Sequence, residues 1–379
     1  MTGAGVNAET ACESCLRRAW LVASLASNIE ICCDDRPGRR IPELLALSNQ
    51  ELVAAVAPRQ VDKMLTRNSE LSHGDMVDAL CDADCWACCE HDGRFPDGLG
   101  DARDRPSILI GRGGGFPLCE LSRAASVTIV GSRRATGYGL EVSRNLGHGI
   151  ATAGLNVVSG LALGIDGSAH RGALESGRTV AVLASGPDRP YPVSHTRLYR
   201  QVAEKGLVIS EMPPGTAPRR WGFPARNRVM AALSSMTVVV EAARRSGSLI
   251  TAEMAADAGR EVGAVPGQVN LGPAAGTNEL LANGAALVRD ARDVFDRVLG
   301  LGVGPRLDHG PALGPQIRRV VEAVERGCST VDAVADVLAR DGSAVAADLA
   351  RLEILGFLTC SLTGTYSRTS LQAPYSPEQ

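Results

Sequence analysis

A short arginine-rich segment in the second half of the chain contains the residue types that bind nucleic acid. It runs from Arg219 to Arg228 and reads Arg-Arg-Trp-Gly-Phe-Pro-Ala-Arg-Asn-Arg, although aromatic residues make up only 3% of the chain. Guanidinium groups hold phosphates, and an exposed ring gives a stacking surface worth about 1–3 kcal/mol per base. The segment therefore favours binding of single strands, unless Trp221 and Phe223 are core residues and the arginines form a solvated face.

Two glycine-rich loops contain the residue types that bind phosphate. The first, Gly131 to Gly139, reads Gly-Ser-Arg-Arg-Ala-Thr-Gly-Tyr-Gly, and the second runs from Ser159 to Arg171. Each joins a predicted strand to a predicted helix, where unpaired N–H groups and an arginine fork attract an anion. The dinucleotide-binding spacing and the Walker lysine are both missing, so we expect no cofactor. Asp166 and His170 are weak evidence for acid–base catalysis, because an aspartate near a helix start is more often a cap.

Cysteines are concentrated near the N-terminus, where eight of the eleven lie before residue 90. The pairs Cys12-x2-Cys15 and Cys85-x2-Cys88 have the ligand spacing of a four-thiolate zinc site, with about 70 residues between the pairs. His91 could also contribute. The favoured alternative is that these cysteines are buried as small apolar residues, so we expect no metal site.

Short runs rich in Val and Ile recur through the centre of the chain and are separated by helical patterns. Non-alternating apolar runs of this kind predict buried strands of a parallel sheet covered on both faces. The expected fold class is α/β, an extended Rossmann-like, doubly wound, mostly parallel sheet. Ligands bind such sheets beyond the carboxyl ends of the strands. The runs are 127–130, 155–158, 180–183, 207–209, 237–240 and 262–265.

The chain is expected to divide into several domains. Residues 1–90 are predicted to form a small helical domain, and residues 91–298 the sheet domain. A Gly- and Pro-rich linker is expected over 299–315. Residues 316–372 contain three helical patterns and an alternating segment, which predicts a winged-helix-like domain, followed by a tail over 373–379.

Charge and hydropathy limit the functions that are possible. The chain has 379 residues, with 39 Lys and Arg against 42 Asp and Glu, which gives a net charge of -3. This balance excludes a wholly basic surface but not a local basic stripe, since residues 213–248 contain six arginines and one glutamate. No apolar run is long enough to span a membrane, and no secretory signal is visible, so we expect a cytoplasmic protein.

Several of these segments, taken in order, resemble motifs of the DNA-processing protein A family (DprA, also called Smf). The resemblance covers roughly residues 91–296. It rests on Val130-Gly-Ser-Arg133 with Thr136, Ser159-Gly-Leu-Ala-Leu-Gly-Ile-Asp-Gly-Ser-Ala-His170, Phe223-Pro-Ala-Arg-Asn-Arg228, Ser246-Gly-Ser-Leu-Ile-Thr-Ala252, Val265-Pro-Gly267 and Gly276-Thr-Asn-Glu279.

The resemblance implies a protein that binds single-stranded DNA, usually as a homodimer. It also implies that the protein helps to load the RecA recombinase during natural transformation, and that it is not an enzyme. Arg133 would contact phosphate, Phe223 would lie beside a base, and Arg220 would take a basic position that is commonly lysine in relatives. The residues carried over for DNA binding are Gly131, Ser132, Arg133, Thr136, Ser159, Gly160, Arg220, Phe223, Arg226, Asn227, Arg228, Gly247, Ser248 and Thr251.

Two parts of the chain depart from the family pattern. The N-terminal cysteines are not a general family feature. The recognition-helix candidate, Ser343 to Leu355, is not basic, so we expect it to contact protein or to be vestigial rather than to read DNA.

Two alternatives use the same kind of fold. Nucleoside-monophosphate phosphoribohydrolases carry a contiguous Pro-Gly-Gly-x-Gly-Thr-x-x-Glu loop. Here Gln268 follows Pro266-Gly267, and Gly276-Thr-Asn-Glu279 comes later. The contiguous motif is therefore missing, although fold alone does not distinguish a DNA-binding protein from a phosphoribohydrolase. A non-catalytic nucleotide sensor is a third possibility, with no specific support in the sequence.

Overall fold

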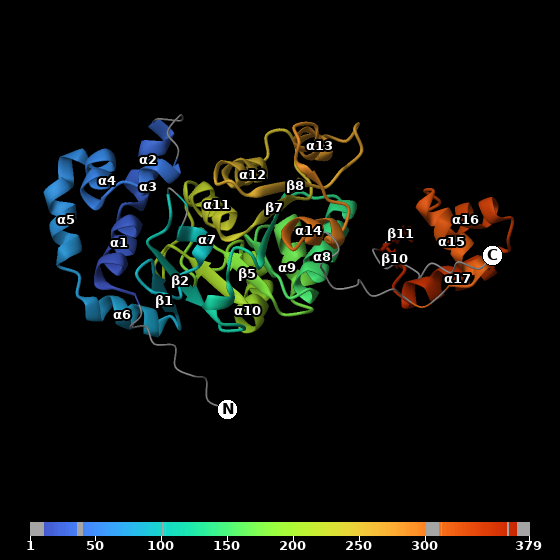
Figure 1. The fold of residues 1–379 in the computed structure, drawn as a ribbon, viewed down its shortest axis with the longest axis horizontal. Helices are drawn as coiled ribbons and strands as arrows, with labels where there is room; N and C mark the ends of the chain where they lie inside the picture. Colours follow the sequence, from blue (N-terminus) through green and yellow to red (C-terminus); the bar gives the residue numbers. More distant parts are fainter. Residues whose placement is uncertain are drawn as a thin grey trace, which may run out of the picture. The chain divides into compact units, whose positions relative to one another are not determined.

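The structure is a computed structural model of the chain. It describes residues 11–35, 41–100, 102, 104–300, 311, 313–361 and 364–369. The chain divides into two compact units, Met1–Gly304 and Pro305–Gln379, and Figure 1 labels most of their elements. Most of the predicted linker and the whole predicted tail lie outside the described residues, and the predicted boundary at residue 90 stays a prediction.

The first unit is built on a sheet that has nine strands within the described residues. Their order is β1-β2-β6-β5-β4-β3-β7-β8-β9. All pairings from β6 to β9 across the sheet are parallel, and only β1 and β2 run antiparallel to their neighbours. The predicted α/β, mostly parallel sheet is therefore confirmed. The strands are β1 Trp86–Cys89, β2 Ile108–Arg112, β3 Ser126–Val130, β4 Asn156–Ser159, β5 Thr179–Val182, β6 Leu207–Ser210, β7 Met236–Val239, β8 Glu261–Ala264 and β9 Ala286–Leu287.

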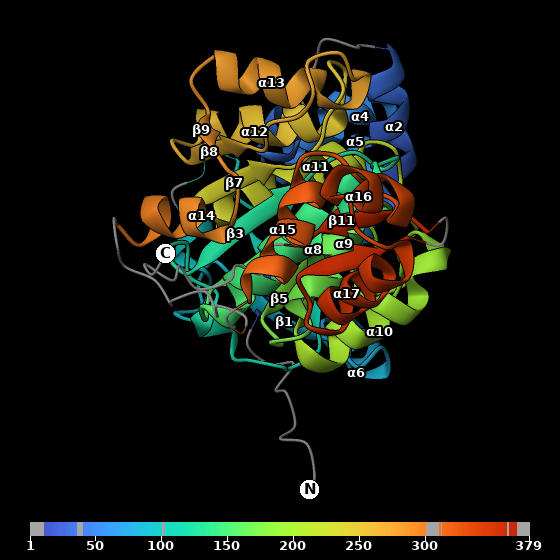
Figure 2. The same ribbon diagram turned by 90° about the vertical axis from the view of Figure 1, so that its right-hand side faces the viewer.

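Helices cover both faces of this sheet, which explains why the central strands are apolar on both sides. Every residue of β3 to β7 is buried. On one face α8 packs against α9, and α9 against α10, whereas α11 packs against α12 on the other (Figure 2). The short helix α7 also packs against α11. The helices are α7 Asp97–Gly100, α8 Gly137–Thr152, α9 Ile165–Ala173, α10 Thr196–Lys205, α11 Gly222–Leu233, α12 Gly247–Asp257, α13 Ala275–Ala282 and α14 Ala291–Val298.

Among the described residues, six further α-helices precede the sheet and belong to the same compact unit. Part of their apolar surface packs on Trp221, at the start of α11, and the Trp221 indole donates to the Ala26 carbonyl at 3.0 Å. Trp221 is therefore a core residue and not an exposed stacking ring. The helices are α1 Glu13–Ser24, α2 Ala26–Asp35, α3 Ile41–Leu45, α4 Asn49–Val56, α5 Val61–Ser69 and α6 His73–Asp82.

The second unit has its own small core. Val320, Val334, Leu349 and Phe357 are all fully buried within it. This arrangement confirms the three helices and the hairpin predicted from the sequence, while a winged-helix role stays a prediction. The elements are α15 Pro315–Glu325, α16 Val331–Leu338, α17 Gly342–Ile354, β10 Leu358–Cys360 and β11 Tyr366–Arg368, the last two antiparallel.

Length and hydropathy of the helices bear on membrane insertion. Across the part of the chain that the structure describes, none of the helices is both long and apolar enough to cross a membrane.

Candidate nucleic-acid interface

The main candidate site is a cavity of about 590 Å³ at the carboxyl ends of β3 and β7. β3 pairs with β4 on one side and with β7 on the other, so the order of the strands reverses at this point. Such a reversal leaves a crevice in which open α/β sheets bind their ligands. The residues lining the cavity, which we call the switch-point pocket, include Gly131, Ser132, Arg133, Arg134, Asp166, Phe223, Arg226, Asn227, Arg245, Gly247, Ser248 and Thr251.

Several helices begin around the switch-point pocket. α8 follows the loop after β3, α12 follows the loop after β7, and α11 contributes its first two turns to the lining. Ser246 caps α12 by accepting a hydrogen bond from the Ser248 N–H. Helix N-termini carry partial positive charge and orient N–H groups outward, so this end of the sheet favours an anion such as phosphate.

The loop after β3 is fixed by backbone hydrogen bonds on both sides. The Ser132 N–H donates to the Glu241 carbonyl at 2.7 Å, and the Ser132 carbonyl accepts from the Ile165 N–H at 3.2 Å. A side chain at Gly131 would come within 2.6 Å of Ile165, so glycine is needed for this close approach. The loop therefore presents Arg133 from a rigid support.

Phe223 and Arg133 form the most distinctive surface in the pocket. The half-buried Phe223 ring lies in the first turn of α11, and the exposed Arg133 guanidinium lies 5.1 Å from its centre. Tyr191 places its ring 5.5 Å from the Phe223 ring, at an angle of 49°. A flat ring beside a cation suits a nucleobase with its phosphate.

Arg226 is buried beneath the pocket. Its guanidinium donates to the carbonyls of Gly160, at 2.5 Å, and Val182, at 2.6 Å, and lies 3.9 Å from Asp166. Burial lowers the pKa of Arg226 to about 10, although Asp166 acts in the opposite direction, so the group stays charged at neutral pH. Burial raises the pKa of Asp166, against the attraction of Arg226. Arg226 therefore holds the ends of β4 and β5 together.

Arg228 lies on the opposite side of α11. It is buried, its guanidinium donates to Glu211 at 2.5 Å and to the Asp104 carbonyl, and it lines a different cavity. Arg220 is exposed but precedes α11 and does not line the pocket. The four arginines of this segment therefore do not form one continuous exposed stripe.

Two other predicted residues have structural partners. The Thr136 hydroxyl caps α8 and donates to the buried Glu241 carboxylate at 2.7 Å, and the Ser159 hydroxyl donates to the Ile129 carbonyl at 2.6 Å.

Most of the residues predicted to bind DNA line the switch-point pocket. Those in its lining are Gly131, Ser132, Arg133, Phe223, Arg226, Asn227, Gly247, Ser248 and Thr251. Those outside it are Thr136, Ser159, Gly160, Arg220 and Arg228.

No role was assigned from the sequence to two residues of the site, Tyr191 and Arg245. Tyr191 lies in an irregular loop, where periodicity carries no information, and its place beside Phe223 becomes visible only in three dimensions. Arg134 and Arg245 are exposed lining residues. Asp166 is the only carboxylate among the lining residues, so the exposed charge of the pocket is positive.

The segment that would carry a phosphoribohydrolase glutamate lies outside the pocket. The Asn278 side chain bonds to both the N–H and the carbonyl of Gly267, at 3.1 and 3.0 Å, which joins the two halves of the interrupted motif. Glu279 remains largely exposed, 4.0 Å from Arg244, and does not line the pocket.

Comparison with protein-family models gives one match that covers the sheet. The model described as DNA recombination-mediator protein A matches residues 86–299. The chain belongs to this family. The DNA recombination-mediator match begins at the first residue of β1 and ends just after α14, so it excludes α1 to α6 and the second unit.

Curated members of the family are similar to the chain over its centre. The putative DNA processing protein DprA of Mycobacterium tuberculosis H37Rv is 44% identical over 245 residues, which cover 63% of this chain and 62% of the relative. DprA of Bacillus subtilis is 38% identical over 206 residues, which cover 54% and 68%. The chain thus spans less than two thirds of the length of the mycobacterial relative.

Solved structures of the family share the fold. The DprA structure from Streptococcus pneumoniae is 30% identical with a TM-score of 0.59, and the match covers 74% of this chain and 95% of that one. DNA processing protein A from Helicobacter pylori, whose structure concerns its single-stranded DNA binding mode, is also 30% identical, with a TM-score of 0.50 and coverage of 54% and 93%.

Proposed function

We propose that the chain binds single-stranded DNA in the switch-point pocket. The observation that supports this most directly is the Phe223 ring, placed beside the exposed Arg133 guanidinium at the reversal of the strand order. The Helicobacter pylori relative, studied for its single-stranded DNA binding mode, supports the same ligand. Duplex DNA fits the proposal less well, because paired and stacked bases are not available to a ring in a pocket.

The proposed contacts follow from the chemistry of the lining. Phosphates lie at the start of α12, near Gly247 and Ser248. They also lie against the guanidinium groups of Arg133, Arg134 and Arg245. A base stacks on Phe223. Arg226 does not contact phosphate in this proposal, because its donors already bond to backbone carbonyls; it positions the floor of the pocket.

We further propose that the bound strand is delivered to the RecA recombinase, in recombination and natural transformation, by a homodimer acting in the cytoplasm without catalysis. Membership of the DNA recombination-mediator family supports this step. It is tested by measuring RecA-dependent ATP hydrolysis on single strands already covered by a single-strand-binding protein. We expect the chain to shorten the lag before hydrolysis begins. An unchanged lag with normal DNA binding would refute the loading step alone.

The binding step is tested by fluorescence anisotropy of a labelled single strand, with unlabelled single strand, duplex and mononucleotide as competitors. We expect strong competition by the single strand and weak competition by the duplex. Phe223→Ala and Arg133→Gln should both weaken binding, whereas wild-type affinity in both variants would contradict the site. Release of base and ribose 5-phosphate from a nucleoside monophosphate would instead favour the phosphoribohydrolase alternative.

A further inference from the structure

Three cysteines and a histidine converge at the N-terminal end of the first unit. The ligand atoms of Cys12, Cys15, Cys89 and His91 all lie within 4.8 Å of one another. The His91 Nδ1 atom is 3.5 Å from the Cys12 Sγ, 3.5 Å from the Cys15 Sγ and 3.9 Å from the Cys89 Sγ. We infer that these four side chains form a structural Zn²⁺ site.

The distances from the His91 nitrogen to the three sulfurs are close to those of a tetrahedron around one zinc ion. With Zn–S bonds of about 2.3 Å and Zn–N bonds of about 2.0–2.1 Å, tetrahedral angles place each sulfur about 3.6 Å from the nitrogen. The distances from the His91 nitrogen lie within a few tenths of an ångström of this value. Only small side-chain movements are needed to bind the ion.

The four ligands come from two elements that lie side by side. Cys12 is the N-cap of α1 and Cys15 lies in its first turn, while Cys89 ends β1 and His91 follows it in the next turn. The two-residue spacing between Cys12 and Cys15 is common for one half of a four-ligand zinc site. The ion would therefore tie α1 to the edge strand of the sheet.

The sequence favoured no metal, and its candidate ligands, Cys12, Cys15, Cys85 and Cys88, differ from this set. Cys88 is on the opposite face of β1 from Cys89, because successive strand residues alternate, and it packs in the main core with Leu109. Cys85 is buried, and its thiol donates to the Ala83 carbonyl at 3.4 Å. Cys89 and His91, and not the candidates Cys85 and Cys88, thus lie beside Cys12 and Cys15.

Two features of the surroundings stabilise negative charge on sulfur atoms of the cluster. The Cys12 backbone N–H donates to the Cys89 sulfur at 3.4 Å, a contact that stabilises negative charge on sulfur. The N-terminus of α1 adds partial positive charge beside Cys12 and Cys15. Three soft thiolates with one imidazole select zinc over magnesium or calcium, and four protein ligands leave no open coordination position.

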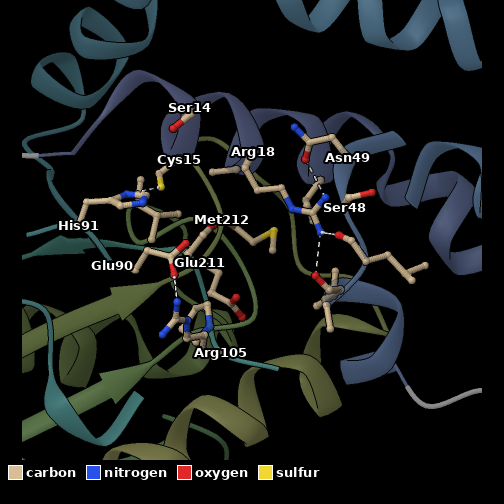
Figure 3. A pocket seen from close by; sticks show the side chains of 18 of the residues that line it. Ser14, Cys15, Arg18, Ser48, Asn49, Glu90, His91, Arg105, Glu211 and Met212 are labelled. Carbon is tan, nitrogen blue, oxygen red and sulfur yellow. Dashed lines mark hydrogen bonds and ion pairs between the residues drawn. The ribbon is translucent and has the colours of Figure 1, made fainter. Parts of the chain in front are cut away.

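The cluster is accessible to an incoming ion. Cys15 and His91 line a cavity of about 410 Å³ between α1 and the sheet, and Figure 3 shows the Cys15 thiol and the His91 ring directed toward each other. His91 is exposed and Cys12 is partly exposed, whereas Cys15 and Cys89 are buried. The site is thus enclosed by protein on one side and reachable from solvent on the other.

The metal content of the full-length chain tests this inference independently of DNA binding. The protein is expressed with added Zn²⁺, purified without chelator under reducing conditions, and measured by inductively coupled plasma mass spectrometry. We expect about one zinc per chain. Cys12→Ser, Cys89→Ser and His91→Ala should each lose most of the metal, whereas the matched controls Cys85→Ala and Cys88→Ala should retain it.

A second measurement does not depend on how the variants fold. Metal-free wild-type chain is titrated with Co²⁺, and a tetrahedral thiolate site gives intense visible absorption that is removed by one equivalent of Zn²⁺. Folded, reduced wild-type protein with neither bound zinc nor this spectrum would overturn the inference. Equal metal loss from the Cys88→Ala control would overturn the ligand assignment, as would a disulfide that joins Cys12 to Cys15 after purification under the same reducing conditions.

Discussion

The exposed arginines of the switch-point pocket set the expected salt dependence of single-strand binding. Arg133, Arg134 and Arg245 are exposed and line the pocket, whereas Arg226 is buried and bonded to backbone carbonyls. Each phosphate neutralised on a single strand contributes about -0.7 to the slope of log affinity against log salt. With three contacts the slope is about -2.1, so affinity falls about 18-fold between 50 and 200 mM salt.

Replacing Arg133 by glutamine removes one of these contacts. The slope should become about -1.4, and the loss over the same salt range should shrink to about sevenfold. The change in slope is more informative than the change in affinity. A variant that is partly unfolded binds less DNA, but the folded molecules still neutralise the same number of phosphates and keep the wild-type slope.

Fluorescence anisotropy at a series of salt concentrations measures both slopes. Arg144→Gln is a suitable control, because Arg144 is exposed and paired with Glu175. Glu175 follows the C-terminal end of α9 and therefore lies near the amino ends of the parallel strands, whereas the pocket lies at their carboxyl ends. Its slope should equal that of the wild type. An Arg133→Gln slope that matches the wild type, or a wild-type affinity independent of salt, would refute the assignment of phosphate contacts.

Three other predictions concern single side chains. Phe223→Ala should cost about 1–3 kcal/mol in single-strand affinity with the salt slope preserved, and an unchanged affinity would contradict stacking. Gly160→Ala should lower the free energy of unfolding by about 1–3 kcal/mol in urea, because a methyl group would overlap the Arg226 guanidinium; wild-type stability would show that this packing is loose. Burial lowers the pKa of His170 in the folded chain to about 3, whereas in the unfolded chain it is about 6.5. As the pH falls below about 6.5, the imidazole is therefore protonated in the unfolded chain but not in the folded one, and the free energy of unfolding decreases. Between pH 7 and 5 the loss is about 2 kcal/mol, and His170→Asn should lack this part of the slope in urea titrations at each pH; an identical slope would refute it.

The central strands could be predicted from the sequence because each is a short apolar run that must be buried on both faces. β4 and β6 were placed within a residue of their observed bounds. The antiparallel strands β1 and β2 were missed. β1 is rich in cysteine and follows helices directly, so the apolar pattern does not change where the strand begins. The two-residue β9 is too short to give a pattern.

The loops of the site could be predicted better than the side chains of α11. Loops after parallel strands meet at one end of a sheet, so Gly131 and Gly247 could be placed together in advance. α11 lies between the sheet, α12 and the N-terminal helices, and it has buried residues on every side, including Arg226 and Arg228. From the sequence alone, an arginine in such a helix is expected to be exposed, because a buried charge needs polar partners. Its carbonyl and carboxylate partners come from distant parts of the chain and are known only from the tertiary structure.

The packing of Trp221 against the N-terminal helices limits how far the chain can be truncated. The region that matches the family, residues 86–299, contains Trp221, Met212 and Ala225, but the apolar side chains that cover them come from α1 to α4. A chain trimmed to that region would expose this patch two residues away from Phe223, at the start of the helix that supports the pocket. In this protein the N-terminal helices therefore complete the packing around the start of α11, and we expect a stable fragment to extend beyond residues 86–299.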